Sequence, residues 1–145
     1  MCWRSLNPED TKLLKSDNKI VYKILSVRKK GGKLYASIFF NYEYYLNKEQ
    51  SITININIIK RPEFLDTCKA PKHLELKRDV YIVENGYHSY NNLAKAIRNL
   101  VSYNNCPFEV EVFRVFKCLI PKGTKYIINE SDEVVSENII ILNEI

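Results

Sequence analysis

The chain has 145 residues, of which 46% are hydrophobic and 27% charged, and its formal net charge at pH 7 is +5. This composition excludes an intrinsically disordered protein. The sequence shows neither an apolar run long enough to span a membrane nor the apolar core of a signal peptide. A chain of this length can fold around one core, so we expect a single domain over residues 1–145, located in the cytoplasm.

The charge is unevenly divided along the chain. Residues 1–78 contain 16 basic and 8 acidic side chains, a balance of +8, and residues 79–145 contain 6 and 9, a balance of −3. A basic surface attracts phosphate-bearing ligands, but it also serves simply as a solvated face. Both interpretations stay open.

The first half of the chain predicts strands. Residues 19–27 are rich in β-branched and aromatic residues, and the two glycines in residues 29–33 favour a hairpin turn before a partner strand over 34–40. Residues 52–58 alternate strictly between isoleucine and polar residues, which is the clearest strand signal in the sequence. Residues 61–78 are predicted to form a loop, and residues 79–83 a short strand.

One helix stands out in the second half. Apolar residues recur at helical spacing from Leu93 to Val101, which predicts a helix over about residues 90–103 with Ser89 or Asn91 as the N-cap. A long strand is predicted over residues 108–120. A Pro-Lys-Gly turn, two further strands and an acidic turn then make a closing β-meander. The predicted fold class is α+β, a mainly antiparallel β-sheet with one principal helix.

The segment Gly86–Tyr90 is the most suggestive candidate site. It places Tyr87, His88, Ser89 and Tyr90 just before the predicted helix, where unpaired N–H groups and positive potential suit an anion. His88 could titrate near neutral pH, and a tyrosine ring could stack on a base. The alternative is an ordinary capped helix whose His88 is bonded to backbone.

Other candidates are isolated residues. Lys23 could enter a pocket or be solvated, Lys122 could touch phosphate from its turn, and Glu137, at the start of the last strand, could act as a base or lie exposed. The four cysteines form no C-x-x-C pair and there are only two histidines, so we expect no metal site. Neither a Walker A loop nor a G-x-G-x-x-G segment is present.

Three stretches together resemble a family. They are Met1 and Cys2, then residues 21–25 with the Gly86–Tyr90 segment, and finally residues 120–126 with 135–141. In these the chain is similar to small proteins of gut Bacteroidetes and their phages, to which no activity is attached. The resemblance implies an accessory protein in a bacterial host cell, with a role in counter-defence.

A second resemblance is to ADP-ribosyltransferases. These have an early aromatic-basic strand, a middle strand with Ser or Tyr, and a late hairpin leading to a catalytic Glu. The order is matched here by Tyr22 and Lys23, by Ser89 and by Glu137. Lys23 stands where the family has Arg or His, and Val135-Ser-Glu replaces two glutamates flanking one residue, which puts the activity in doubt.

These observations lead to one functional hypothesis and two alternatives. We expect a small accessory binding protein, not an enzyme, that captures a nucleotide-like ligand or a host protein through Tyr87, His88, Ser89, Tyr90, Lys23 and Lys122, without a cofactor. The first alternative is an NAD-using transferase with Tyr22, Lys23, Ser89 and Glu137 as catalytic residues. The second is a protein–protein adaptor. We expect neither a membrane nor nucleic acid as a partner, and a homo-oligomer stays open.

Overall fold

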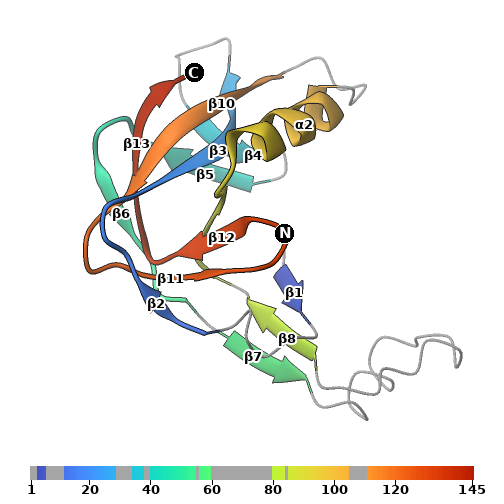
Figure 1. Cartoon of the computed structure of the whole chain (residues 1–145). Coiled ribbons are helices and arrows are strands. Elements are labelled where there is room, and N and C mark those ends of the chain that lie inside the picture. The colour runs from blue at the N-terminus through green and yellow to red at the C-terminus, as the bar shows by residue number, and fades with distance from the viewer. Residues whose placement is uncertain are drawn as a thin grey trace, which may run out of the picture.

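Antiparallel strands dominate the computed structural model of the chain (Figure 1). The structure describes residues 3–5, 12–28, 34–37, 40–54, 56–59, 80–83, 85–104 and 111–145. In chain order, the elements of this part are β1 (Trp3–Ser5), β2 (Leu14–Lys15), β3 (Lys19–Arg28), β4 (Leu34–Ser37), β5 (Phe40–Tyr44), β6 (Glu49–Ser51), β7 (Ile56–Ile59), β8 (Val80–Val83), β9 (Tyr87–Tyr90), α2 (Leu93–Asn104), β10 (Glu111–Ile120), β11 (Lys125–Ile128), β12 (Glu133–Ser136) and β13 (Asn138–Glu144).

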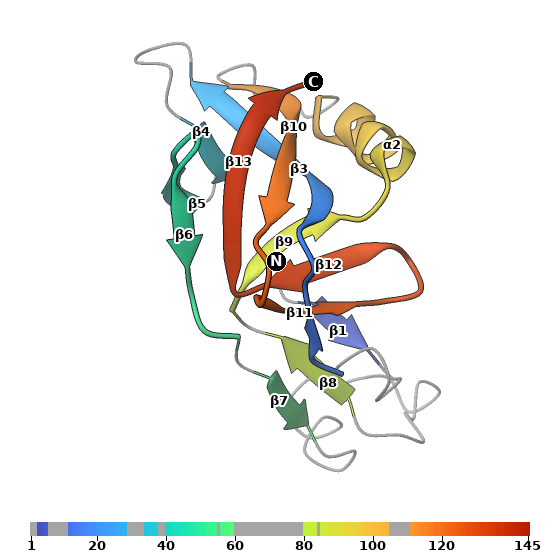
Figure 2. The same cartoon turned by 60° about the vertical axis from the view of Figure 1, so that its left-hand side comes forward.

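The main sheet is built around two long strands. β3 and β10 pair antiparallel over ten residues each, from Lys19 opposite Ile120 to Arg28 opposite Glu111. The strand order is β2-β11-β12-β9-β3-β10-β13-β6, and β4 and β5 continue from the far end of β3. The views in Figures 1 and 2 show a strongly curved sheet. Leu46, just after β5, bridges to Ile141 of β13, so the strands enclose one interior.

The side chains of β3 point alternately to the two faces of this sheet. Val21 and Leu25 are buried in the enclosed interior, together with residues of β5, β9, β10, β12 and β13. Tyr22 and Ile24 point to the other face, where they pack with α2. Successive side chains of a strand point to opposite faces. Lys23 therefore shares the interior face with Val21 and Leu25.

The helix confirms the main helical prediction, although its cap differs. α2 covers Leu93–Asn104, close to the expected 90–103. Asn92, and neither Ser89 nor Asn91, caps it: the Oδ1 atom of Asn92 accepts hydrogen bonds from the backbone N of Ala94 at 2.8 Å and of Lys95 at 3.4 Å. Ser89 lies in β9 and is committed to the sheet.

The predicted strand over residues 52–58 is wrong as one continuous element. β6 ends at Ser51 in the main sheet, and β7 begins at Ile56 in a second sheet of order β1-β8-β7. Between them the backbone N of Ile52 donates to the backbone O of Glu137 at 2.8 Å. The segment thus crosses from one sheet to the other. Its alternation indicated extended backbone but could not reveal a change of partner.

The small sheet is packed against the large one by a shared apolar cluster. Val83 of β8 joins Ile127 of β11 and Val135 of β12, and Ile54 from the crossing segment packs against them. The closing segment is a meander only in part. β11 and β12 form a hairpin, but β13 leaves it and pairs with β10. The antiparallel α+β class is confirmed, with strands more prominent than expected.

Some expectations fall outside the described residues: the turn at 29–33, the loop at 61–78 and the start of the strand at 108–110. No helix in the described part of the chain is both long and apolar enough to cross a membrane.

Candidate functional site

The interior of the large sheet contains a buried lysine. Lys23 lies between Val21 and Leu25 on β3 and is only 6% exposed. Its Nζ atom donates a hydrogen bond to the backbone O of His88 on β9. The same atom lies 5.0 Å from the centroid of the Tyr44 ring. An ammonium group has three N–H donors, so one hydrogen bond and one aromatic face leave its capacity partly unused.

Burial governs the protonation of this lysine and of its neighbour Cys118. It lowers the pKa of Lys23 from 10.5 to about 8, because the charged form loses hydration, while the interaction with Cys118 opposes this shift. Burial raises the pKa of Cys118 to about 12, although the positive charge of Lys23 acts in the opposite direction. Cys118 is therefore a protonated thiol at neutral pH, fully buried, and no thiolate stands beside the ammonium.

Two serine hydroxyls lie on the same face as Lys23. Ser89 of β9 is opposite Val134, and Ser136 of β12 is opposite Tyr87, where Val134 and Tyr87 belong to the interior cluster. The two serines are 4% and 0% exposed, and the Oγ atom of each has no hydrogen-bond partner. Buried polar groups are nearly always hydrogen-bonded. These hydroxyls are thus available to another polar group.

Two tyrosines complete this interior. The rings of Tyr44 and Tyr87 are both buried, with centroids 6.0 Å apart and an edge-to-face angle of 66°. Edge-to-face pairs of this kind are favourable, and the Tyr44 ring also faces Nζ of Lys23. Together, Lys23, Ser89, Ser136, Tyr44 and Tyr87 form what we call the interior site. Chemically it offers one cation and two hydroxyls, which are groups that an anion can bind, next to two buried aromatic rings.

The expected position of His88 is wrong. His88 lies within β9, where residues Tyr87–Tyr90 alternate between buried and half-buried, and not at the N-terminus of α2. Burial, together with the charge of Lys23, lowers the pKa of His88 to about 4. The ring is therefore neutral at pH 7 and supplies no positive charge to an anion. The contribution of His88 to the interior site is its backbone carbonyl.

The remaining predicted binding residues lie elsewhere. Tyr90 packs with the cluster beneath α2, on the opposite face of the sheet from Lys23. Lys122 is exposed in the turn after β10, where its backbone N donates to Oδ1 of Asn18 at 3.0 Å. This turn adjoins Lys19, which pairs with Ile120. Lys23 is four residues further along β3, about 13 Å away.

The four residues suggested for transfer chemistry are only partly assembled. Lys23 and Ser89 share the interior, whereas Tyr22 packs beneath α2 and pairs with Tyr90. The Oε1 atom of Glu137 accepts a hydrogen bond from the backbone N of Ile54 at 3.3 Å, which ties its carboxylate to the crossing segment between the sheets. This contact of the Glu137 carboxylate joins it to neither Lys23 nor Ser89.

Sequence reasoning missed Tyr44 and Ser136 as partners of Lys23. A lysine at the centre of the apolar alternation from Val21 to Leu25 was the available signal for an inward-pointing cation. No signal identified the strands that would face it, because β5 and β12 reach this interior through pairings that are distant in sequence.

Neither a metal centre nor a known relative gives the site an identity. Among the described residues, no group of three or more His, Cys, Asp or Glu side chains could hold a metal ion. No family model matches the sequence, and no similar curated protein or solved structure is found at a significant level. The chemistry of the interior site therefore carries the functional argument.

Proposed function

We propose that this chain is a binding protein that captures a small anionic, nucleotide-like molecule at the interior site. One observation carries the proposal. A buried ammonium, that of Lys23, lies on the same face as two buried hydroxyls, those of Ser89 and Ser136, that have no partner. An anion bound there would meet one charge-assisted donor and two neutral donors.

The physical support for the proposal is that the buried charge of Lys23 has no opposite charge beside it among the described residues. A buried charge without an opposite charge lowers the stability of the fold, and here the lowered pKa reports that cost. An anionic ligand would supply the missing opposite charge and favour the ammonium form. The rings of Tyr44 and Tyr87 would then contact the base or sugar of the ligand.

The resemblance to phage-associated proteins supports a proposed role in counter-defence. In that setting, a protein that holds a nucleotide without changing it would remove a host signal from solution.

Equilibrium dialysis against adenosine monophosphate and a cyclic dinucleotide tests this proposal. We expect the wild-type protein to deplete one of these ligands and to return it chemically unchanged after heat denaturation. Lys23→Met should lower the affinity by about 10- to 100-fold, the loss expected for a hydrogen bond to a charged group. The matched control is Lys117→Met, half-buried on β10. Equal binding by both variants, or no depletion by the wild type, would contradict the proposal.

The alternative NAD-using transferase has one supporting observation, the shared interior position of Lys23 and Ser89. Its test is the release of nicotinamide from NAD. Turnover by the wild type that Glu137→Gln abolishes would replace capture with catalysis as the function. Turnover that persists in this variant would leave Glu137 with only its contact to Ile54.

A further inference from the structure

A second group of lysines lies at one edge of the large sheet, well away from the interior site. β2 is the outermost strand there and pairs with β11, so that Lys15 stands directly opposite Lys125. Both side chains are exposed. Like charges directly opposite each other on neighbouring strands are destabilising. On its other side Lys125 adjoins Glu137, whose backbone N donates to the backbone O of Lys125 at 3.0 Å, so the repulsion between the two lysines is only partly compensated, and an external anion would relieve it further.

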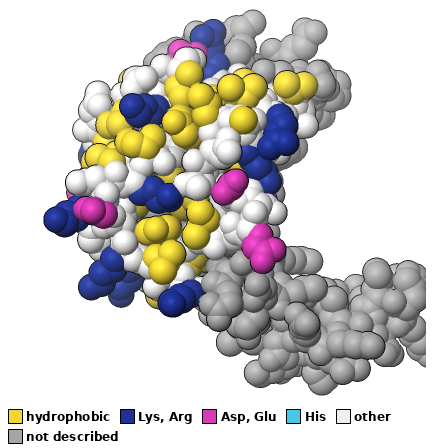
Figure 3. All heavy atoms as spheres, viewed as in Figure 1, with side chains coloured by type: hydrophobic (Ala, Val, Ile, Leu, Met, Phe, Trp, Pro, Cys, Tyr) yellow, Lys and Arg dark blue, Asp and Glu magenta, His cyan; other side chains and the backbone are white. Residues whose placement is uncertain are grey.

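Three further lysines flank this pair. Lys12 precedes β2, Lys19 begins β3 and Lys122 lies in the turn before β11. We call these three residues together with Lys15 and Lys125 the lysine edge. In Figure 3, Lys and Arg side chains gather at the lower left, over the part of the molecule where Figure 1 draws β2 and β11. Other Lys and Arg side chains are spread over the rest of the same view, so the lysine edge is one basic region among several.

The backbone beneath the lysine edge is tightly connected. The backbone N of Ser16 donates to the O of Thr124 at 2.8 Å, and the N of Gly123 donates to the O of Ser16 at 2.9 Å. The buried Ser16 hydroxyl also donates to the O of Ile120 at 2.8 Å. These bonds fix the backbone of residues 14–19 against that of residues 120–125, so the points from which these lysine side chains extend keep their spacing.

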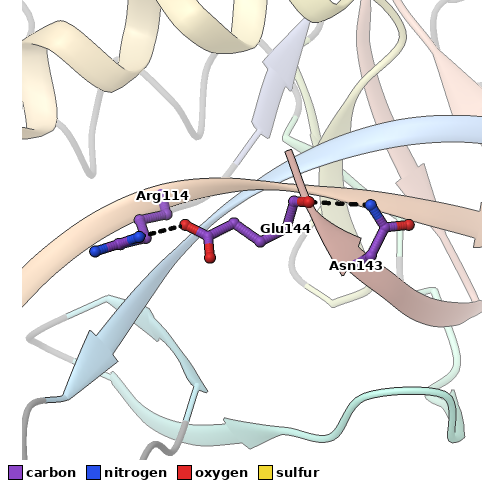
Figure 4. A network of polar contacts seen from close by, with 3 residues as sticks. All are labelled: Arg114, Asn143 and Glu144. Carbon is purple, nitrogen blue, oxygen red and sulfur yellow. Dashed lines mark hydrogen bonds and ion pairs between the residues drawn. The ribbon is translucent and has the colours of Figure 1, made fainter.

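Two acidic residues reduce the net positive charge of this edge, but neither forms an ion pair with one of its lysines. Asp17 and Glu137 are the acidic neighbours, and the carboxylate of Glu137 contacts the backbone of Ile54. None of the five lysines forms an ion pair with another described residue. Arg114 provides the contrast, because its Nη1 atom lies 2.7 Å from Oε1 of Glu144 (Figure 4). The five lysines of the lysine edge therefore form no ion pair with a described residue, and a ligand can contact them.

We propose that the lysine edge binds the phosphate backbone of single-stranded nucleic acid. Five cations spread along an open sheet edge match a ligand with a regular series of phosphates, whereas a single small phosphate would meet only one or two of them. Tyr126, whose ring lies 5.8 Å from Nζ of Lys19, packs against the interior cluster, so binding at this edge rests on its charge and not on base stacking. A lipid surface fits less well, because Leu13 is the one large exposed hydrophobic residue of this segment.

This inference departs from the expectation drawn from the sequence. The charge balance was taken separately for residues 1–78 and 79–145. Lys122 and Lys125 belong to the second segment, which is acidic overall. Folding places them beside Lys12, Lys15 and Lys19, and so creates a basic surface that crosses the division. The inference does not depend on the interior site, because the two share β3 but no residue: Lys19 belongs to the lysine edge and Lys23 to the interior site.

The test is the salt dependence of binding to a fluorescent oligothymidylate of about 20 nucleotides. If five phosphates are neutralised, log K should fall with log salt with a slope of about −3.5, at about 0.7 per contact. The double variant Lys15→Glu with Lys125→Glu should bring the slope to about −2 and weaken binding at least about tenfold at low salt. The matched control is Lys95→Glu with Arg98→Glu on α2, which changes the net charge equally and should bind nearly as the wild type does.

Three results would overturn the proposal. The wild type could fail to bind at about 50 mM salt, where such contacts are strong. The helix control could lose as much affinity as the edge variant, which would make net charge the cause. Vesicles containing phosphatidylserine could bind more tightly than the oligonucleotide, with the same dependence on Lys15 and Lys125, which would make a lipid surface the partner. If the glutamate variant does not fold, Lys15→Gln with Lys125→Gln answers the same question.

Discussion

The interior site and the lysine edge use the same side chain in opposite ways. Lys23 is held inside a closed apolar core, where its hydration is lost and its pKa falls to about 8. Lys15 and Lys125 remain in water at the end of the sheet. The same residue type therefore lowers stability in two different ways. The buried lysine does so because its charge loses hydration, and the exposed lysines do so because their charges repel each other. The comparison also predicts different responses to mutation in the two regions.

The largest expected difference concerns the two glycines, one in each region. Gly86 leads into β9 with a φ of +121°, and a Cβ atom there would lie 2.3 Å from Cγ1 of Val135. Gly123 lies in the turn of the lysine edge with a φ of +86° and has no atom within 4 Å of its Cβ position. We expect Gly86→Ala to lower the free energy of unfolding by about 3 kcal/mol or more, and Gly123→Ala by about 1 kcal/mol. Urea unfolding of both variants measures this. Equal losses would show that the region around Gly86 is not tightly packed.

The next largest effect is a gain in stability when the buried charge is removed. Each pKa unit corresponds to about 1.4 kcal/mol, so the shift of Lys23 from 10.5 to about 8 represents about 3 kcal/mol of cost below pH 8. Because Lys23→Met also removes the contacts with His88 and Tyr44, we expect a net gain of about 2 kcal/mol at pH 7. Lys117→Met serves again as the control and should stay within about 0.5 kcal/mol of the wild type. A loss of stability in Lys23→Met would mean that the ammonium is well satisfied.

The pH dependence of stability should separate the regions further. The pKa of Lys23 is lower in the folded chain, so above pH 8 the unfolded chain binds more protons and stability rises with pH. We expect a rise of about 1 kcal/mol between pH 7 and pH 9. The pKa of Cys118 is raised to about 12, which makes stability fall above pH 9 and limits the useful range. Lys23→Met should abolish the rise, whereas Lys125→Met should leave it intact.

A smaller gain is expected from the hydroxyls of the interior site. Ser136→Ala removes a buried Oγ atom without a partner, and we expect unfolding to require up to about 1 kcal/mol more. Ser102→Ala, exposed on α2, should change little. In dialysis the same Ser136→Ala variant should bind its nucleotide more weakly. A destabilised Ser136→Ala protein would indicate that the hydroxyl has a hydrogen bond in solution.

The smallest effect is expected at the lysine edge. Lys15→Glu turns a repulsive cross-strand pair into an attractive one, because β2 is the outermost strand and Lys15 faces Lys125 alone, and it should raise the free energy of unfolding by about 0.2–1 kcal/mol. The same variant should bind oligothymidylate less well. Increased stability together with weakened binding would show that this lysine serves binding and not the fold. A lysine that served the fold alone would not show both changes.

Local sequence patterns predicted most helices and strands, but they did not predict which strands pair with one another. The apolar stripe from Leu93 to Val101 was enough to place α2, and the alternation from Val21 to Leu25 was enough to place β3. The interior site depends on pairings between β3, β9 and β12, which no local pattern contains. His88 was misplaced because residues 87–90 were expected to lead directly into the helix, whereas they form β9, which Gly86 enters with a positive φ. The lysine edge was missed because its residues come from both ends of the sequence.

The most direct test of the account is an NMR titration of the Lys23 side-chain amine, with Lys23→Met used to assign its signal. The account predicts a pKa of about 8 in the free protein. It also predicts a rise toward the ordinary value when the nucleotide identified by dialysis is bound, because an anion favours the charged form. A pKa near 10.4 in the free protein would show that Lys23 is solvated. An unchanged pKa in the presence of bound nucleotide would show that the ligand lies elsewhere, and either result would contradict the interior site.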